Sequence, residues 1–155
     1  MQNTNKVGNL RLALGSDHHG FDLKQAIMTL IQELGYSYHD FGCYSTDVVD
    51  YPDIAQEVAQ AVASGDFDQG ILICSTGIGM SIAANKIKGI RAALCYDVFA
   101  AQRARQHNDA NILCLRGENI ELSSTLVIVK TYLSTNFGGG RHIPRLDKVK
   151  ALEMH

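Results

Sequence analysis

Short apolar runs alternate along this chain with segments in which apolar residues recur every three or four positions. The runs have the length and composition of buried strands, and we predict strands over residues 10–14, 36–41, 70–74, 90–96 and 111–115. The recurring segments have the period of helices with one buried face, and we predict helices over about 23–34, 50–62, 80–86, 97–107 and 121–133.

Strand and helix alternate five times, an order typical of an open parallel sheet with right-handed crossovers. The chain of 155 residues is long enough for one domain with its own core, so we predict a single domain over 1–155. Within it, residues 1–8 read as a frayed tail. Three glycines at 138–140 interrupt the compact pattern, and we predict a C-terminal arm over 137–155 that ends in a helix over about 145–154.

The composition argues against two classes of partner. Lys and Arg number 14 against 16 Asp and Glu, which leaves no basic stripe of the kind that binds nucleic acid. No run approaches the roughly 18 uncharged apolar residues of a membrane span. The first six residues contain no apolar signal core, so we expect no membrane partner and a cytoplasmic location.

The sequence predicts neither a metal nor a nucleotide cofactor. Three of its four cysteines, Cys74, Cys95 and Cys114, lie in apolar runs, as buried free thiols do. No Cys-x-x-Cys pair occurs, and the six histidines are not spaced as zinc ligands beside the cysteines. The dinucleotide fingerprint and the Walker loop are also missing.

The strongest chemical signal is the turn after the third predicted strand, Cys74-Ser75-Thr76-Gly77-Ile78-Gly79. Ligands of open parallel sheets bind at the carboxyl ends of the strands, where this turn would lie. Gly77 and Gly79 allow backbone conformations that other residues avoid, and amide N–H groups at a helix start can hold an anion. The same helix start favours a thiolate on Cys74, which could then act as a base. The alternative is a plain strand-to-helix turn with a buried cysteine.

Three other groups of polar residues are candidates for a site. Asp17 and His18 follow the first strand, and their alternative role is that of surface turn residues. His107 and Asn108 lie between a helix and a strand, where a histidine can simply cap the helix or serve as an acid. Arg141 and Arg145 form either a solvated basic tail or a phosphate clamp on a flexible arm.

Six short segments carry these candidates in one order, namely 15–20 (GSDHHG), 50–52 (DYP), 71–79 (ILICSTGIG), 81–86 (SIAANK), 105–111 (RQHNDAN) and 139–142 (GGRH). Each segment is weak alone, but together they resemble the type B ribose-5-phosphate isomerases and the related allose-6-phosphate and galactose-6-phosphate isomerases. The resemblance covers about residues 10–145. It implies a Rossmann-like α/β fold and aldose–ketose isomerisation of a sugar phosphate through an enediolate, without metal or nucleotide.

The resemblance also implies roles for individual residues. Cys74 matches the base of the cysteine-type branch, and Met80 stands where another branch has a glutamate base. Thr76 and the amides of residues 75–79 match the anion hole, and His107 matches the ring-opening acid. The remaining matches are to substrate contacts, which are Asp17, His18, Tyr51, Ser75, Gly77, Ile78, Gly79, Asn108, Arg141 and Arg145.

Two departures from the family's pattern change this picture. Glu118 occupies the place of an arginine that contacts substrate, and Arg116 lies two residues earlier, where it could compensate. Ser75 replaces the commoner glycine beside the base, which requires a negative φ at that residue. The Glu118 departure motivates an alternative function, the isomerisation of a six-carbon sugar phosphate such as allose 6-phosphate or galactose 6-phosphate.

The resemblance further implies a homodimer or homotetramer with the site between two subunits. A flexible arm bearing Arg141 and Arg145 could reach the site of another subunit, and two copies is the commonest number in closed symmetric assemblies. A third interpretation of the chain is a non-catalytic phosphosugar-binding module, because a fold alone does not imply activity.

Overall fold

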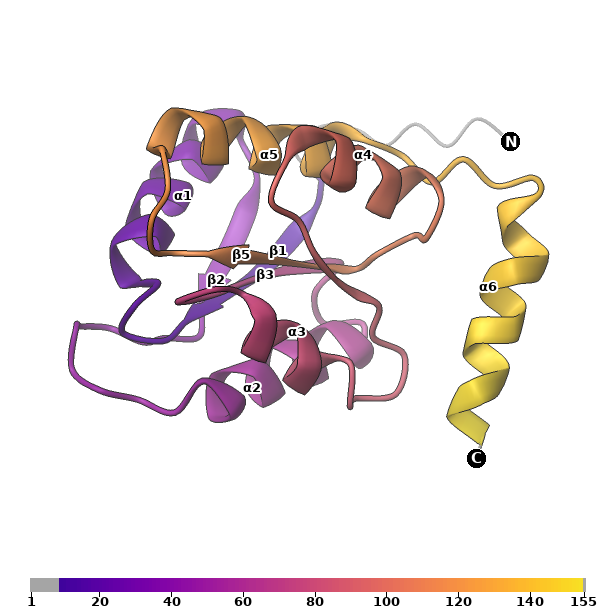
Figure 1. The fold of residues 1–155 in the computed structure, drawn as a ribbon, viewed down its shortest axis with the longest axis horizontal. Coiled ribbons are helices and arrows are strands. Elements are labelled where there is room, and N and C mark those ends of the chain that lie inside the picture. The colour runs from indigo at the N-terminus through magenta and orange to yellow at the C-terminus, as the bar shows by residue number, and fades with distance from the viewer. Residues whose placement is uncertain (1–8, 155) are drawn as a thin grey trace.

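The computed structural model describes residues 9–154, so the predicted tail over 1–8 lies outside the described residues. The predicted alternation of strands and helices is present (Figure 1). The strands are β1 (Arg11–Ser16), β2 (Ser37–Asp40), β3 (Gln69–Cys74), β4 (Ala92–Leu94) and β5 (Ile112–Arg116). The helices are α1 (Phe21–Leu34), α2 (Tyr51–Ala63), α3 (Ile78–Ala84), α4 (Val98–Gln106), α5 (Leu122–Ser134) and α6 (His142–Ala151), and a 3-10 turn, η1 (Leu152–Met154), follows α6.

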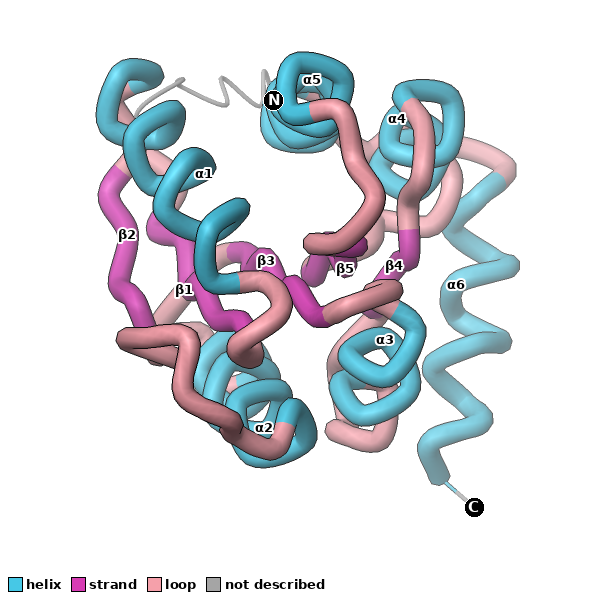
Figure 2. The backbone as a smooth tube through the Cα atoms, turned by 60° about the vertical axis from the view of Figure 1, so that its left-hand side comes forward, coloured by secondary structure: helices cyan, strands magenta, loops and turns pink. Residues whose placement is uncertain are grey.

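The five strands form one parallel sheet in the order β2-β1-β3-β5-β4. Helices α1, α4 and α5 cover one face of the sheet, and α2 and α3 cover the other (Figure 2). The prediction of a three-layer α/β fold with a five-stranded parallel sheet is therefore confirmed. Because every strand runs the same way, the loops that follow all five strands meet at one edge of the sheet.

The centre of the sheet is apolar on both faces because helices cover both. All six residues of β3 are buried, as expected for the middle strand of a parallel sheet. Ile71 and Ile73 belong to the core beneath α1 and α5, whereas Leu72 and Cys74 belong to the core beneath α2 and α3. Cys74 is thus the last core residue of its strand, and the turn that follows it begins at the sheet edge.

Most element boundaries lie within one or two residues of the predicted ones, and the fourth strand, the third helix and the last helix show the clearest differences. The fourth strand is confined to Ala92–Leu94, because the backbone at Arg91 bonds instead to the side chain and backbone of Asn111. The third helix ends at Ala84 rather than near residue 86. The last helix begins at His142, three residues early, because Gly139 and Gly140 adopt positive φ and their carbonyls accept the first helical N–H groups.

The predicted C-terminal arm is a segment that ends in α6, which stands beside the sheet edge formed by β4 (Figures 1 and 2). No residue of α6 is buried. Beyond it, the Glu153 carboxylate accepts a hydrogen bond from the Gly89 N–H at 2.8 Å, which ties the end of the arm to the body. None of the helices in residues 9–154 is long and apolar enough to cross a membrane.

Candidate active site

A pocket of about 800 Å³ lies at the carboxyl ends of the strands, where the loops after β1 and β3 meet the start of α2. Eight of the residues predicted for the site line it, and besides Gly79 these are Asp17, His18, Tyr51, Cys74, Ser75, Thr76 and Ile78. Gly77 caps the start of α3 beside them. The pocket therefore gathers the turn after β3, the loop after β1 and the first turn of α2.

Cys74 lies at the bottom of this pocket and is only 5% exposed. The Gly77 N–H donates to the Cys74 sulfur across 3.2 Å. The other nearby thiols differ in environment. Burial raises the pKa of Cys95 to about 11, with Asp97 adding to the effect, and burial also raises the pKa of Cys114. Neither of those two thiols lines the pocket, whereas Cys74 does.

The two glycines of the turn serve different purposes. Gly77 has φ of 79°, in the left-handed region, which agrees with the prediction of a special backbone conformation. For Gly79 that prediction is wrong, because it lies inside α3 with helical geometry. A glycine is required at position 79 because a Cβ at that position would lie only 2.7 Å from the ring of Tyr51. The φ of Ser75 is not positive, so the backbone at this position accommodates a serine side chain.

Two of the amides predicted for the anion hole bond within the turn itself. The Gly77 N–H is directed at the Cys74 sulfur, and the Ile78 N–H donates to Thr76 Oγ1 at 3.1 Å. The second bond fixes the Thr76 side chain while leaving its hydroxyl proton to point elsewhere. The hydroxyl of Tyr96, in the loop after β4, donates to the Thr76 carbonyl at 2.7 Å and holds the turn from that side.

The loop after β1 is held by its own carboxylate. Asp17 Oδ1 accepts the N–H groups of His19 at 2.9 Å and Gly20 at 3.2 Å. Asp17 is nearly buried, while His18 and His19 face each other with ring centres 4.2 Å apart. His18 Nδ1 also accepts the N–H of Val49 at 3.4 Å, which links this loop to the segment before α2.

Glu118, where the resemblance led us to expect an arginine, joins the loops after β1, β3 and β5. Its carboxylate accepts a hydrogen bond from Ser75 Oγ at 2.8 Å and pairs with His19 Nδ1. Two backbone bonds run parallel to these contacts, from the Gly117 N–H to the Cys74 carbonyl and from the Glu118 N–H to the Ser75 carbonyl. The carboxylate is therefore tied to the rim of the pocket rather than pointing freely into it.

Arg116 does not take the place of the missing arginine in this structure. Its guanidinium lies over the Tyr96 ring, 4.6 Å from the ring centre, and it lines a separate pocket of about 240 Å³ on the α5 side. The idea that Arg116 compensates for Glu118 is thus not supported by its position.

Several pocket residues were missed by the sequence analysis. His19 and Asp53 add titratable groups, and Val48, Val49, Pro52 and Ile82 add apolar surface. Sequence does give a signal for part of this wall, because the predicted helix over 50–62 begins there and residues 50–52 are one of the segments that carry the resemblance. Met80, which stands where a rival carboxylate base would be, is fully buried in the core beneath α2 and α3.

The other four predicted site residues lie elsewhere in the same chain. α4 starts near the carboxyl ends of the strands and runs back toward their amino ends. His107 and Asn108, which follow α4, therefore lie at the opposite end of the sheet from Cys74. His107 and Arg141 line a second pocket, of about 780 Å³, and Arg145 lies on α6. One copy of the chain therefore does not bring these four residues to the Cys74 pocket.

The second pocket has its own internal contacts. The rings of His107 and His142 stack with centres 4.3 Å apart. The pKa of His142 is lowered by loss of hydration and by the positive charge of His107, Arg141 and Arg145. This gathering of cationic groups at residues 141–145 is a suitable surface for a phosphate. Within residues 9–154 no cluster of three or more His, Cys, Asp or Glu is arranged to hold a metal ion.

Comparison with known proteins identifies the family. The family model described as "Ribose/Galactose Isomerase" matches residues 12–149. Ribose-5-phosphate isomerase B of Escherichia coli is 45% identical over 143 residues, which are 92% of this chain and 96% of that protein. Both alignments include the Cys74 turn and the segment around His107.

Solved structures agree with this finding. Clostridium thermocellum ribose-5-phosphate isomerase B has a TM-score of 0.92 at 47% identity, covering 94% of this chain and 98% of that one. The Mycoplasma genitalium ribose-5-phosphate isomerase B with bound ribulose-5-phosphate has a TM-score of 0.89 at 41% identity, covering 95% and 98%. The chain therefore belongs to the ribose/galactose isomerase family of sugar phosphate isomerases, within the branch of the type B ribose-5-phosphate isomerases.

Proposed function

We propose that this chain interconverts ribose 5-phosphate and ribulose 5-phosphate through an enediolate, with Cys74 as the base. The observation that carries the proposal is the position of the Cys74 sulfur, at the base of the pocket with the Gly77 N–H directed at it. The ribulose-5-phosphate bound to the M. genitalium relative supports the choice of substrate.

In this mechanism the Cys74 thiolate removes the proton from C2 of the open-chain aldose. The electron pair forms the C1–C2 double bond of the enediolate while the carbonyl oxygen O1 takes up negative charge. A proton then passes from the C2 hydroxyl to O1, and the Cys74 thiol returns its proton to C1, which gives the ketose with its carbonyl at C2 and regenerates the thiolate. Thr76 can donate its hydroxyl proton to the developing oxyanion, because its oxygen already accepts the Ile78 N–H. Ser75, Gly77, Ile78 and Gly79 provide the rest of the wall around this oxygen.

The sugar chain would lie along the loop after β1 and the start of α2. Asp17 and His18 offer one carboxylate and one imidazole to the sugar hydroxyls, and Tyr51 closes the pocket over Gly79. The carboxylate of Glu118 at the rim makes this side a poor place for a phosphate, so the phosphate end points away from it.

The missing acid and phosphate ligands would come from a second copy of the chain. His107 would open the furanose ring, Asn108 would bind the sugar, and Arg141 and Arg145 would bind the phosphate. The support for this is geometric: these four residues lie away from the Cys74 pocket of their own chain, on exposed surface beside the second pocket and α6. We therefore propose a homodimer, or a tetramer built from such dimers, with each site shared between two copies.

The test is isomerase activity in the presence of a chelator, since no step uses a metal. The wild-type protein should convert ribose 5-phosphate, and Cys74→Ala should lose at least about 100-fold in kcat, because proton transfer by a positioned group contributes that much or more. Cys95→Ala, which removes a buried thiol outside the pocket, is the matched control and should retain activity. Undiminished turnover by Cys74→Ala would exclude the cysteine base.

Glu118 is the reason for one alternative function, the isomerisation of a six-carbon sugar phosphate. Comparing kcat/KM for ribose 5-phosphate, allose 6-phosphate and galactose 6-phosphate decides between them. A preference for the pentose of tenfold or more, equal to about 1.4 kcal/mol in transition-state binding, supports the first proposal, and the reverse preference supports the alternative.

A further inference from the structure

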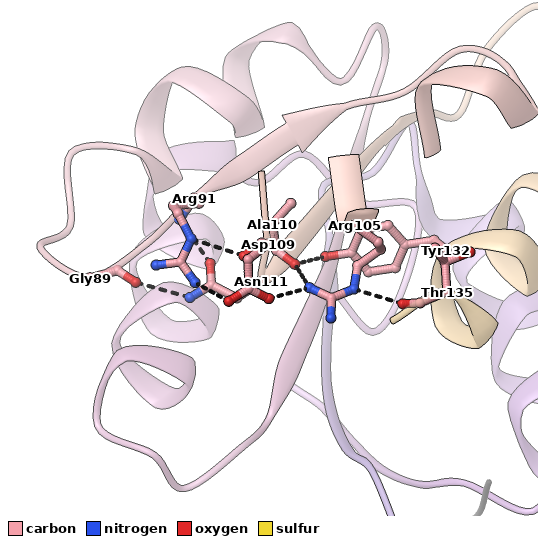
Figure 3. A network of polar contacts seen from close by, with 8 residues as sticks. All are labelled: Gly89, Arg91, Arg105, Asp109, Ala110, Asn111, Tyr132 and Thr135. Carbon is pink, nitrogen blue, oxygen red and sulfur yellow. Dashed lines mark hydrogen bonds and ion pairs between the residues drawn. The ribbon is translucent and has the colours of Figure 1, made fainter. Parts of the chain in front are cut away.

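We propose that Arg105 and Asp109 form a positioning pair that holds His107 and Asn108 in the geometry needed for ring opening. The proposal rests on the proposed function and extends it to two residues that do not contact the substrate themselves. The pair lies at the end of α4, on either side of the two site residues, and Figure 3 shows its contacts.

The Arg105 guanidinium is buried and spans three segments of backbone and side chain. Its side chain is 8% exposed. Nη1 donates to Asp109 Oδ1 at 2.9 Å and to the Ala110 carbonyl at 2.6 Å, while Nε donates to the Thr135 carbonyl at 3.2 Å. The planar fork of an arginine can satisfy these acceptors at once, which the single ammonium of a lysine cannot do.

Asp109 completes the clamp from the other side of the corner. Its φ is 45°, a left-handed conformation that reverses the chain directly after Asn108 and that Asp and Asn adopt more readily than most residues. Its carboxylate faces Arg91 Nη2 at 3.5 Å in addition to Arg105, and its carbonyl accepts from Arg91 Nε at 2.9 Å. The corner that contains His107 and Asn108 is thus fixed at both ends.

A buried aromatic residue packs beneath the Arg105–Asp109 pair. Tyr132 is fully buried, lies 5.8 Å from the Arg105 guanidinium, and donates its hydroxyl to the same Ala110 carbonyl at 2.8 Å. The segment that leaves α5 at Thr135 continues to Gly138, whose N–H donates to the Gln106 carbonyl at 2.9 Å. The clamp therefore also sets where the chain that bears Arg141 departs from the body.

A test can separate ring opening from proton transfer. Ribose 5-phosphate is a furanose that must be opened, whereas ribulose 5-phosphate cannot close to a furanose because its O5 carries the phosphate. In D₂O the Cys74 base can exchange the C1 proton of ribulose 5-phosphate with solvent deuterium without any ring opening. Conversion of ribose 5-phosphate and C1 exchange in ribulose 5-phosphate, followed by NMR, thus report on different steps.

Arg105→Lys should slow ribose 5-phosphate conversion by about tenfold or more and leave C1 exchange within about threefold of wild type, since general acid–base catalysis of this kind is worth 10²–10⁴-fold when fully lost. His107→Ala should show the same selective loss to a larger extent. Arg103→Lys is the matched control, because the Arg103 guanidinium, on the same helix, donates to the Gln106 side chain and stacks on Phe99 rather than contacting Asp109. Both rates should be unchanged in this variant.

Asp109→Asn keeps the left-handed turn and all backbone partners of Arg105, and it should give a smaller loss of the same kind. Should Arg105→Lys fail to fold, the Asp109→Asn result decides alone. Equal losses in both rates, or no loss in either, would overturn the positioning role. A wild-type protein that neither converts nor exchanges these pentose phosphates would instead overturn the proposed function on which the inference rests.

Discussion

At the scale of single residues, the most informative position is Glu118, where the resemblance predicts an arginine and the chain has a carboxylate. The structure occupies both of its oxygens, one with Ser75 and one with His19. This arrangement makes Glu118 a link between the loops after β1, β3 and β5. It also leaves one negative charge at the rim of a pocket proposed to admit a phosphorylated, anionic ligand.

We predict that Glu118→Gln lowers KM for the sugar phosphate by about two- to threefold and leaves kcat unchanged. The amide keeps an acceptor for Ser75 but removes the charge, and a half-exposed charge near an anion is worth only a fraction of 1 kcal/mol. The difference should shrink at high salt, where surface charges are screened.

Steady-state kinetics at two ionic strengths check this prediction. Glu121→Gln, which neutralises the carboxylate at the start of α5 outside the Cys74 pocket, is the control and should leave KM as it is. A tenfold loss of kcat in Glu118→Gln with unchanged KM would instead give Glu118 a part in the chemistry.

At the scale of elements, a buried ion pair fastens α1 to the end of β2. Lys24 is fully buried, and its ammonium donates to both oxygens of Asp40 at 2.6 Å and to the Cys43 carbonyl at 2.7 Å. Cys43 in turn exchanges backbone and side-chain contacts with Ser16, the last residue of β1. The pair thus fixes the segment from which the chain continues to the pocket wall at residues 48–53.

We predict that Lys24→Met reduces the free energy of unfolding by about 3–5 kcal/mol, because it leaves Asp40 as a largely buried charge without its partner. Urea denaturation followed by circular dichroism measures the loss. Arg11→Met is the matched control at the amino edge of the sheet, where Arg11 pairs with Asp68 in solvent, and it should cost much less. Similar losses in the two variants would contradict the prediction.

The elements themselves were largely predictable from sequence, for a physical reason. A parallel sheet covered on both faces requires fully apolar strands, and β3 shows this signal without ambiguity. The limits of β4 were not predictable, because they depend on bonds from Asn111, which is distant in sequence. The need for glycine at 79 was equally hidden, since it arises from the ring of Tyr51 on another helix.

At the scale of the whole molecule, the candidate residues divide between two surfaces of one chain. Sequence motifs identified both groups, but spacing along the chain does not reveal that α4 carries His107 to the sheet edge opposite Cys74. The distance between these two groups becomes clear only once the structure shows that all five strands are parallel. Because of this separation, the proposal that two subunits share each site can be tested by mixing two variant proteins.

We predict that Cys74→Ala and His107→Ala proteins, each inactive alone, regain activity when unfolded and refolded together. Random pairing of two kinds of subunit gives roughly half mixed dimers, and each mixed dimer contains one intact site, so about one quarter of wild-type activity should return. Activity is measured with ribose 5-phosphate, and the separately refolded variants are the controls. No recovery in the mixture would place all catalytic residues in one chain.

The position of α6 beside the body, bearing Arg145 and following Arg141, has a genetic consequence if the site is shared (Figure 1). A chain that ends before residue 141 would retain the whole sheet and its own Cys74 pocket, yet it would deprive its partner of phosphate ligands. Co-expressed with the intact chain, such a truncation would lower the activity of the normal copies that it joins. A shortened allele would therefore behave as dominant over the full-length one rather than as a silent loss.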